Sequence, residues 1–255
     1  MDDWRYDPAH DLGLTPSERR KSLQREAGPL GATSGWMWRR AMRAYLRTVH
    51  RLAVTGREHL PAAPPYVLVA NHASHLDALV LAAAVPPGVA GRVFPLAAGD
   101  TFFTTPAATL FATGVLNALP VWRDHMGAHS LDALRERLER DACIYVLFPE
   151  GTRSRTGAMG AFKPGLGHLV AGTGVPVVPC LLDGTGRAFP PDRSVPRPAR
   201  IRLAIGAPLT FEDAADTRDG WRGVAAQAEA AVRALGGVDN QRIIRSTEAT
   251  WTNER

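Results

Sequence analysis

Tyr66-Val-Leu-Val-Ala-Asn-His-Ala-Ser-His-Leu-Asp77 joins an uncharged apolar run to a cluster of polar side chains. A short, uninterrupted apolar run is typical of a strand buried on both faces of a parallel sheet. The residues from Ser74 to about Val85 have a helical pattern, which Pro86-Pro87-Gly88 ends. This strand–loop–helix unit predicts that His72 lies in the loop and Asp77 in the first turn of the helix.

Strands and helices alternate through the rest of the chain. Apolar runs predict further strands at 92–97, 117–123, 142–148, 175–182 and 201–205. Helical patterns fall between them, and the last one, 221–235, is expected to end at Gly236. The sequence therefore predicts an α/β fold with a mixed, largely parallel central sheet flanked by helices. We expect one domain over residues 34–236, an N-terminal extension over 1–33 and a polar C-terminal tail over 237–255.

The chain carries a net charge of +5, and many of its arginines gather near the N-terminus. Residues 36–52 hold five arginines and no acidic residue, within a helix that we predict over 34–54. One face of this helix holds Arg40, Arg43, Arg47 and Arg51, and it is either solvated or in contact with anionic lipid. Trp36 and Met37 favour an amphipathic membrane-interface helix, which would place a peripheral protein on the cytoplasmic face of the cell membrane. The opposite, apolar face is formed by Trp38, Met42, Tyr45, Val49 and Leu52.

Targeting segments and cysteine chemistry are not expected. Residues 1–30 are charged and lack the apolar stretch of a signal peptide, and the uncharged stretch 101–122 contains prolines and threonines that disfavour a membrane span. The two cysteines, Cys143 and Cys180, lie in apolar runs and are interpreted as buried hydrophobic residues.

His72 and Asp77 are the first candidates for catalysis. A carboxylate that binds one imidazole nitrogen fixes the tautomer and raises the basicity of the other nitrogen, as in hydrolase triads. The pair cannot share a helical face, but a loop position for His72 and a first-turn position for Asp77 allow the contact. Ser74-x-x-Asp77 is also a capping-box pattern, which would explain the aspartate structurally. The two interpretations are compatible, since capping would hold Asp77 beside His72.

A metal site is a competing interpretation of the same residues. His72, His75 and Asp77 resemble part of a metallohydrolase motif, but their spacing differs from His-x-His-x-Asp-His. No Cys/His cluster elsewhere in the sequence completes a site, and His75 is expected to be an exposed helix residue. We therefore predict no metal.

Phe148-Pro-Glu-Gly-Thr-Arg-Ser154 follows another apolar run and forms the second candidate site. Gly151 permits a tight turn, and Thr152 and Arg153 can donate hydrogen bonds to an anion. A turn with solvated charges is the alternative. Lys163 is one of only two lysines, which suggests a point charge with a function, although it could be an ordinary surface residue. Arg123, at the end of an expected strand, is a further candidate anion ligand.

Sequence signatures of several other classes are missing. There is no Gly-x-Ser-x-Gly elbow, no Gly-x4-Gly-Lys-Ser/Thr loop and no Gly-x-Gly-x-x-Gly after a strand. The basic helix lacks the base-reading side chains and aromatic platforms of a nucleic-acid-binding protein, so no nucleic-acid partner is expected.

Taken together, the motifs resemble those of the glycerolipid acyltransferase family, typified by the PlsC-like 1-acyl-glycerol-3-phosphate acyltransferases. The resemblance covers about Thr48 to Ile205. Trp122 departs from the pattern, since many members have a small or acidic residue there. Four blocks match in order: Asn71-His72-x4-Asp77, Gly114–Arg123, Phe148–Ser154 with Phe-Lys-x-Gly at 162–165, and Val175–Pro179.

The resemblance implies an acyltransferase domain. His72, oriented by Asp77, would act as general base on an acceptor hydroxyl, which attacks the thioester of acyl-CoA or acyl-carrier protein. The implied acceptor is a lysophospholipid, 1-acyl-glycerol-3-phosphate above all, with phosphatidic acid as product and no cofactor. The expected substrate-binding residues are Asn71, Arg123, Glu150, Gly151, Thr152, Arg153 and Lys163.

Three alternatives stay open at this point. The acceptor could be another lipid or a specialised alcohol. The His72, His75 and Asp77 cluster could serve a metal-dependent hydrolase. The chain could also be a lipid-binding protein that has the fold without the catalysis.

Overall fold

A computed structural model of the chain describes residues 29–98, 117–121 and 128–251, together with a few isolated positions between 15 and 113. Its centre is a sheet of seven strands in the order β1-β7-β6-β2-β5-β3-β4. The strands are β1 (Ala53–Thr55), β2 (Tyr66–Ala70), β3 (Val93–Ala98), β4 (Leu119–Val121), β5 (Ile144–Leu147), β6 (Val177–Asp183) and β7 (Arg202–Ile205).

The sheet is mixed but mostly parallel. Five neighbouring strands, from β6 across β2, β5 and β3 to β4, run parallel to one another. β7 is antiparallel to β6, and β1 at the edge is parallel to β7. The predicted α/β class with a mixed, largely parallel sheet is confirmed.

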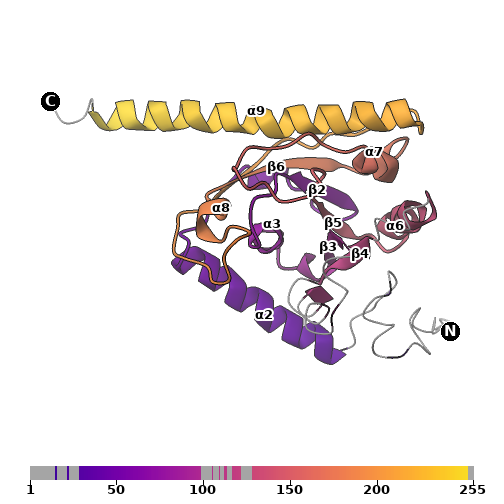
Figure 1. Cartoon of the computed structure of the whole chain (residues 1–255), viewed down its shortest axis with the longest axis horizontal. Helices are drawn as coiled ribbons and strands as arrows, with labels where there is room; N and C mark the ends of the chain where they lie inside the picture. Colours follow the sequence, from indigo (N-terminus) through magenta and orange to yellow (C-terminus); the bar gives the residue numbers. More distant parts are fainter. Residues whose placement is uncertain are drawn as a thin grey trace, which may run out of the picture.

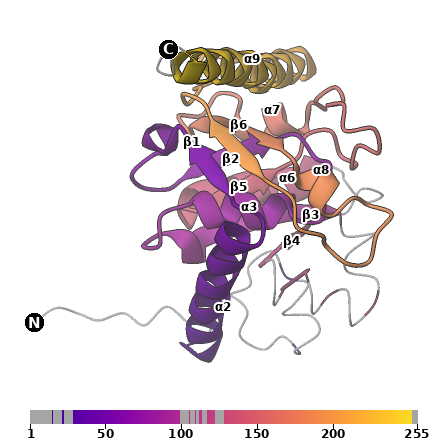
Figure 2. The ribbon, with the colours of Figure 1, turned by 90° about the vertical axis from the view of Figure 1, so that its left-hand side faces the viewer.

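Helices cover both faces of the sheet, so the molecule has three layers (Figures 1 and 2). One outer layer contains α2 and α3, and the other contains α6, α7 and the long α9, which runs along the top of Figure 1. The helices of the described residues are α2 (Pro29–Thr48), α3 (Asp77–Ala84), α6 (Ala128–Arg140), α7 (Gly165–Val170), α8 (Thr185–Ala188) and α9 (Arg218–Trp251), with 3₁₀ turns at Arg57–His59 and Ala90–Arg92.

β2 is the strand that joins the two halves of the core. Tyr66, Leu68 and Ala70 pack with the residues of α2 and α3, whereas Val67 and Val69 pack with those of α6, α7 and α9. All five are at most 1% exposed. Burial of a side chain of this size contributes about 1.5–3 kcal/mol, which explains why an uninterrupted apolar run forms the central strand.

The parallel register brings three loops to one edge of the sheet. β2 lies between β5 and β6, with Val69 opposite Leu147 and Ala70 opposite Cys180. The chain therefore leaves β2 at Asn71, β5 at Phe148 and β6 at Gly184, all on the same side. Ligands of parallel α/β sheets bind outside the carboxyl ends of the strands, and this edge holds the candidate site.

α2 ends earlier than its sequence pattern predicts. The expected end at Val54 is wrong, because the helix stops at Thr48 and Val54 lies in β1. Arg51 has a left-handed backbone with a φ of 47°, and the chain then pairs with β7 at the sheet edge. Val49, expected on the apolar face, is 36% exposed beyond the helix end, whereas Leu46 is fully buried.

α9 continues beyond its predicted end. The helix was expected to stop at Gly236, but it runs from Arg218 to Trp251. Glycine costs about 1 kcal/mol in a helix interior, and the glycine that commonly ends a helix adopts a left-handed conformation. Gly236 does not have a positive φ, so the helix passes through it. Residues 1–14 and most of 16–28, within the expected N-terminal extension, lie outside the described residues.

Candidate active site

His72 and Asp77 are in direct contact. His72 Nδ1 lies 2.7 Å from Asp77 Oδ2, and the aspartate is fully buried at the first residue of α3. The same oxygen accepts backbone N–H bonds from Ala73 at 2.7 Å and Ser74 at 2.8 Å. The pairing interpretation of Asp77 holds, but the predicted capping box does not form, because α3 begins at Asp77 with Leu76 as its N-cap and the Ser74 hydroxyl donates to Phe189 instead. Three donors on one oxygen fix the carboxylate, which in turn fixes the imidazole.

The imidazole of His72 contacts Asp77 at its edge and Phe148 on its face. Its ring stacks on Phe148 with centroids 4.1 Å apart and an interplanar angle of 13°. The side chain is 20% exposed, whereas that of Asp77 is 0% exposed. Because Nδ1 is bonded to Asp77, Nε2 is the nitrogen left for proton transfer. The sequence analysis did not predict that Phe148 stacks on His72. The position of Phe148 directly after β5 is the feature of the sequence that could have indicated it.

Asn71 anchors the loop to the sheet. Its side-chain Nδ2 donates to the carbonyl of Leu182 at 3.0 Å, and its Oδ1 accepts from the Leu182 N–H at 2.8 Å. The amide therefore extends the pairing of β2 with β6 by one step. In this arrangement both polar atoms of Asn71 are bonded to protein, so the residue positions His72.

The second motif packs directly on the first. The His72 N–H donates to Glu150 Oε1 at 2.8 Å, and the Ser154 N–H donates to the His72 carbonyl at 2.7 Å. Glu150 is buried, and its Oε2 accepts the Gly160 N–H at 2.9 Å. The structure thus brings together two motifs that lie on neighbouring strands, and Glu150 braces the loops with both carboxylate oxygens.

Gly151 shapes the turn that follows. It has a φ of 73°, and a Cβ at this position would lie 2.7 Å from Lys163 Nζ. The lysine side chain therefore lies close over the turn, while its backbone N–H donates to Pro149 at 2.9 Å. Thr152 and Lys163 are both exposed, so the turn presents a hydroxyl and an ammonium group to solvent.

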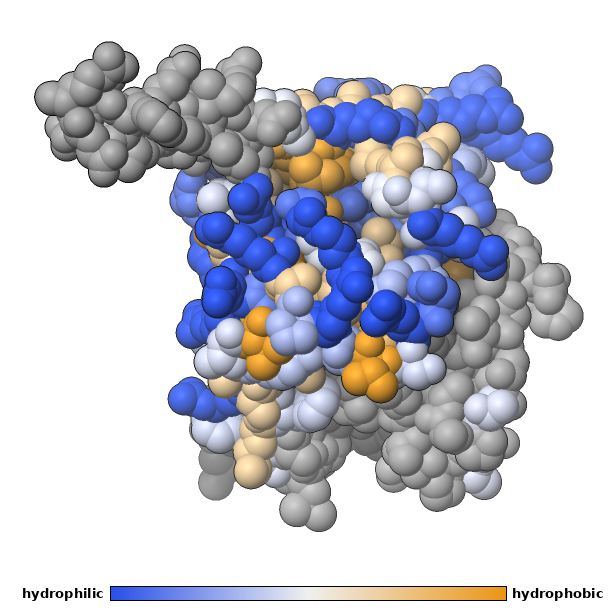
Figure 3. All heavy atoms as spheres, turned by 60° about the vertical axis from the view of Figure 1, so that its left-hand side comes forward, coloured by the Kyte–Doolittle hydropathy of each residue, from blue (hydrophilic) through white to orange (hydrophobic). Residues whose placement is uncertain are grey.

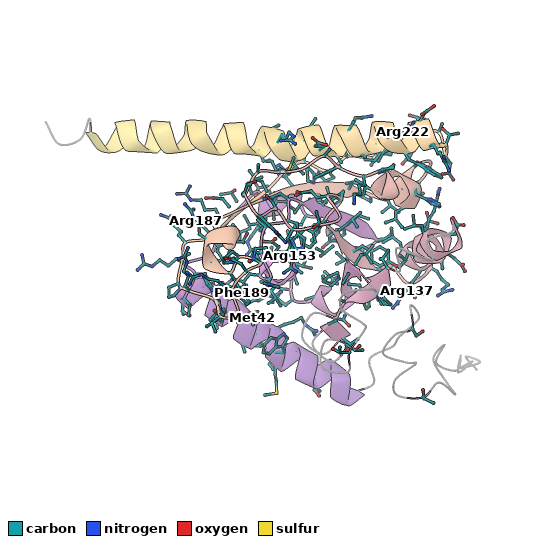
Figure 4. The ribbon with its side chains drawn as sticks, in the orientation of Figure 1. Met42, Arg137, Arg153, Arg187, Phe189 and Arg222 are labelled. Atoms are coloured by element: carbon teal, nitrogen blue, oxygen red, sulfur yellow. The ribbon has the colours of Figure 1, made fainter. Side chains whose placement is uncertain are left out.

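Arg153 has a partner that was not expected. Its Nη1 lies 2.6 Å from Nδ1 and 2.7 Å from Nε2 of His75, and both residues are half-buried. The expectation of an exposed His75 is wrong, because the loop after β5 covers it. Burial, and next the positive charge of Arg153, lower the pKa of His75. Figure 4 shows Arg153 near the centre of the molecule, inward of Phe189.

The loop after β6 closes this side of the site. Ser74 Oγ donates to the carbonyl of Phe189 at 2.7 Å, and the His75 N–H approaches the same carbonyl at 3.4 Å. Phe189 follows α8 and lies beside Met42 of α2 in Figure 4, and both pack against the same core cluster. No sequence motif marked this segment. Its position after a strand parallel to β2 was the signal available.

The helix that carries Asp77 is capped from outside. Arg43 of α2 donates to the carbonyls of Ala83 and Val85, and Arg57 donates to that of Ala84 at 2.9 Å. Cations at a helix C-terminus satisfy its free carbonyls and favour its dipole. Arg43 was predicted on the open arginine face, but this contact directs it to α3.

Arg123 lies outside the described residues, and β4 ends two positions before it, at Val121. Within the part of the chain that the structure describes, no group of three or more His, Cys, Asp or Glu residues is arranged to hold a metal ion.

The family model and the two relatives described here, all of which match this chain, carry acyltransferase names. A protein-family model described as Acyltransferase matches residues 51–183. The 1-acyl-sn-glycerol-3-phosphate acyltransferase LPAT1, chloroplastic, of Arabidopsis thaliana is 32% identical over 166 residues, which cover 63% of this chain and 44% of that protein. The 1-acyl-sn-glycerol-3-phosphate acyltransferase alpha of Homo sapiens is 34% identical over 135 residues, or 52% of this chain and 45% of that protein. The chain thus spans less than half the length of these two relatives.

A solved structure has a similar fold. The 1-acyl-sn-glycerophosphate (LPA) acyltransferase PlsC from Thermotoga maritima aligns with a TM-score of 0.62 and 22% sequence identity. The alignment covers 88% of this chain and 87% of that one. The similarity therefore extends over nearly all of both chains.

Proposed function

Since the chain belongs to the acyltransferase family, we propose that it moves a fatty acyl group from acyl-CoA or acyl-carrier protein to the hydroxyl of a lysophospholipid. The proposed acceptor is 1-acyl-glycerol-3-phosphate and the product is phosphatidic acid. The names of the Arabidopsis and human relatives support this acceptor. The observation that carries the proposal is the contact of the partly exposed His72 with the buried Asp77, next to a loop rich in anion donors to which the His72 backbone is bonded.

The proposed reaction needs one base and no acyl-enzyme. His72 Nε2 takes the proton from the acceptor hydroxyl as its oxygen attacks the thioester carbonyl carbon. The carbon–sulfur bond breaks, and the proton passes from His72 to the leaving thiolate, which gives an ester and a free thiol. General-base assistance of this kind contributes about 10²- to 10⁴-fold in rate. Asp77 supports the step by holding the imidazole in one tautomer and stabilising its protonated form.

The acceptor phosphate is assigned to the turn after β5. Thr152, Arg153 and Lys163 combine a hydroxyl, a guanidinium and an ammonium group around Gly151, and arginine suits phosphate through its planar fork. Gly151 lets the backbone approach the ligand closely. Glu150 and Asn71 act through the loops that they hold. Arg123 stays a prediction as a further phosphate ligand.

The test measures free thiol release from palmitoyl-CoA, with and without 1-acyl-glycerol-3-phosphate, in the wild type and His72→Ala. We expect release that requires the acceptor and falls at least about a hundredfold in the variant. Arg222→Ala, an exposed residue at the start of α9 and far from Arg153 in Figure 4, serves as control. Turnover that survives His72→Ala, with a melting curve like the wild type, would contradict the mechanism.

We also propose that α2 holds the protein on the cytoplasmic face of a membrane that contains anionic lipid. Trp36 and Met37 are 53% and 65% exposed, and the guanidinium of Arg40 lies 5.0 Å from the Trp36 ring centroid. Arg47 is also exposed on this helix. Figure 3 shows scattered hydrophobic side chains among strongly hydrophilic ones on the face it views. Among the described helices, none combines the length and apolar character needed to cross a bilayer.

Vesicle flotation tests this attachment. Each arginine near an anionic surface contributes about 1 kcal/mol, so Arg40→Ala/Arg47→Ala should weaken binding to phosphatidylglycerol vesicles about 30-fold. The matched control is Arg218→Ala/Arg222→Ala, which removes two exposed arginines from α9 in the opposite layer. Equal loss in both double variants would mean that net charge, and not α2, determines binding.

A further inference from the structure

We propose that His75 is a positioning residue, which holds the Arg153 guanidinium toward the acceptor phosphate without cancelling its charge. The inference rests on the proposed function, in which Arg153 binds that phosphate. It assigns a role to a residue of the Asn71–Asp77 loop other than the catalytic pair.

The contact is direct and links the two motifs by side chains. Arg153 Nη1 lies within 2.7 Å of both ring nitrogens of His75. A guanidinium only donates hydrogen bonds, so the imidazole must be neutral to accept one. The ring also makes a hydrogen bond to the backbone of Pro191. A neutral tautomer satisfies both partners at once, whereas a protonated ring would place a second positive charge against Arg153.

The imidazole is itself held in place. Its ring packs against that of Phe189 with centroids 4.7 Å apart and an interplanar angle of 44°. The charged groups that act on it are Arg153, His72 and Asp77, and burial contributes most to lowering its pKa. His75 is therefore neutral near pH 7 and offers a fixed acceptor to the arginine.

A neutral partner matters because several other arginines of this chain have carboxylate partners. Arg135, Arg187 and Arg233 each pair with a carboxylate, which satisfies the guanidinium and cancels its charge. Within the described residues, no carboxylate lies within ion-pair range of Arg153, and its short contacts are to His75. A histidine thus orders the guanidinium while leaving its full charge available to an anion, which a carboxylate at the same position could not do.

The near-isosteric pair His75→Gln and His75→Glu isolates this charge effect. Glutamine keeps a neutral acceptor, so KM for 1-acyl-glycerol-3-phosphate should stay within about threefold of the wild type. Glutamate holds the arginine but neutralises it, so that KM should rise about 10- to 100-fold, as expected for loss of a charge-assisted hydrogen bond. In both variants kcat and the KM for palmitoyl-CoA should change little. In the Arg153→Ala background, His75→Glu should add nothing further to the acceptor KM.

A readout independent of turnover accompanies the kinetics. NMR titration of the histidine rings should show that the pKa of His75 rises in Arg153→Ala, because the arginine charge lowers it. Equal acceptor KM values in the Gln and Glu variants, or an unchanged His75 pKa in Arg153→Ala, would overturn the inference. An acceptor KM that does not respond to Arg153→Ala would instead overturn the assignment of the phosphate to Arg153, whatever the His75 variants do.

Discussion

Replacing Glu150 by glutamine should distinguish a brace from a substrate ligand. The carboxylate is 6% exposed, and its two oxygens accept the N–H groups of His72 and Gly160 at 2.8 and 2.9 Å. Glutamine keeps one acceptor but turns an NH₂ group toward the other backbone N–H. One charge-assisted bond is lost and one partly buried donor is left unsatisfied, which together cost about 2–4 kcal/mol.

This cost can be measured in two ways. Urea unfolding should give a lower free energy of unfolding by that amount, and the melting temperature should fall by about 5–15 °C. Glu139→Gln, on the exposed side of α6, is the matched control and should stay within about 0.5 kcal/mol of the wild type. Because Glu150 holds the His72 backbone, kcat should fall as well. Unchanged stability together with a large rise in the acceptor KM would refute the bracing role and make Glu150 a substrate ligand.

Three further outcomes are expected. Asp77→Asn should lower kcat about 10²- to 10⁴-fold with a small change in the acceptor KM, since it removes the charge that supports protonated His72. If Asp77 bound substrate instead, steady-state kinetics would show a rise in the acceptor KM of similar size. Burial lowers the pKa of His50 below its ordinary 6.5, so the unfolded chain binds more protons and stability should fall as pH drops below about 6.5. The melting temperature of His50→Gln should therefore depend less on pH between 7 and 5 than that of the wild type. Identical slopes of melting temperature against pH in the two proteins would exclude this contribution. Gly167→Ala should destabilise by about 1–3 kcal/mol or more, because its Cβ would lie 2.3 Å from the Trp221 Cα, and an unchanged urea midpoint would mean that α7 and α9 can separate freely.

The parts of the site that follow strand ends were predictable from sequence. The apolar runs before Asn71 and Phe148 identified two buried strands, and parallel strands deliver their loops to one edge. His72 and Asp77 could be paired because the spacing of a loop residue and a first-turn residue allows one contact. The order of residues along the chain was enough for these features.

Other features depended on packing that no local pattern encodes. His75 has the spacing of an exposed helix residue, but the loop carrying Arg153 covers it. Arg43 belongs to an arginine-rich face by periodicity, yet the free carbonyls at the end of α3 attract it inward. The helical pattern through Val54 gave way to pairing at the sheet edge, where tertiary contacts outweigh propensity.

The position of β2 between β5 and β6 has a consequence for how the protein is made. Both neighbours of β2 are encoded later in the chain, and the amide of Asn71 bonds to a backbone 111 residues away. Contacts of such long sequence separation form slowly, and a growing chain emerges from its N-terminal end. Until β6 has emerged, β2 is an apolar strand with an unpaired edge, which invites pairing with other chains. The Asn71 anchor beside the proton-transfer pair is therefore completed late in synthesis, when β6 joins the sheet.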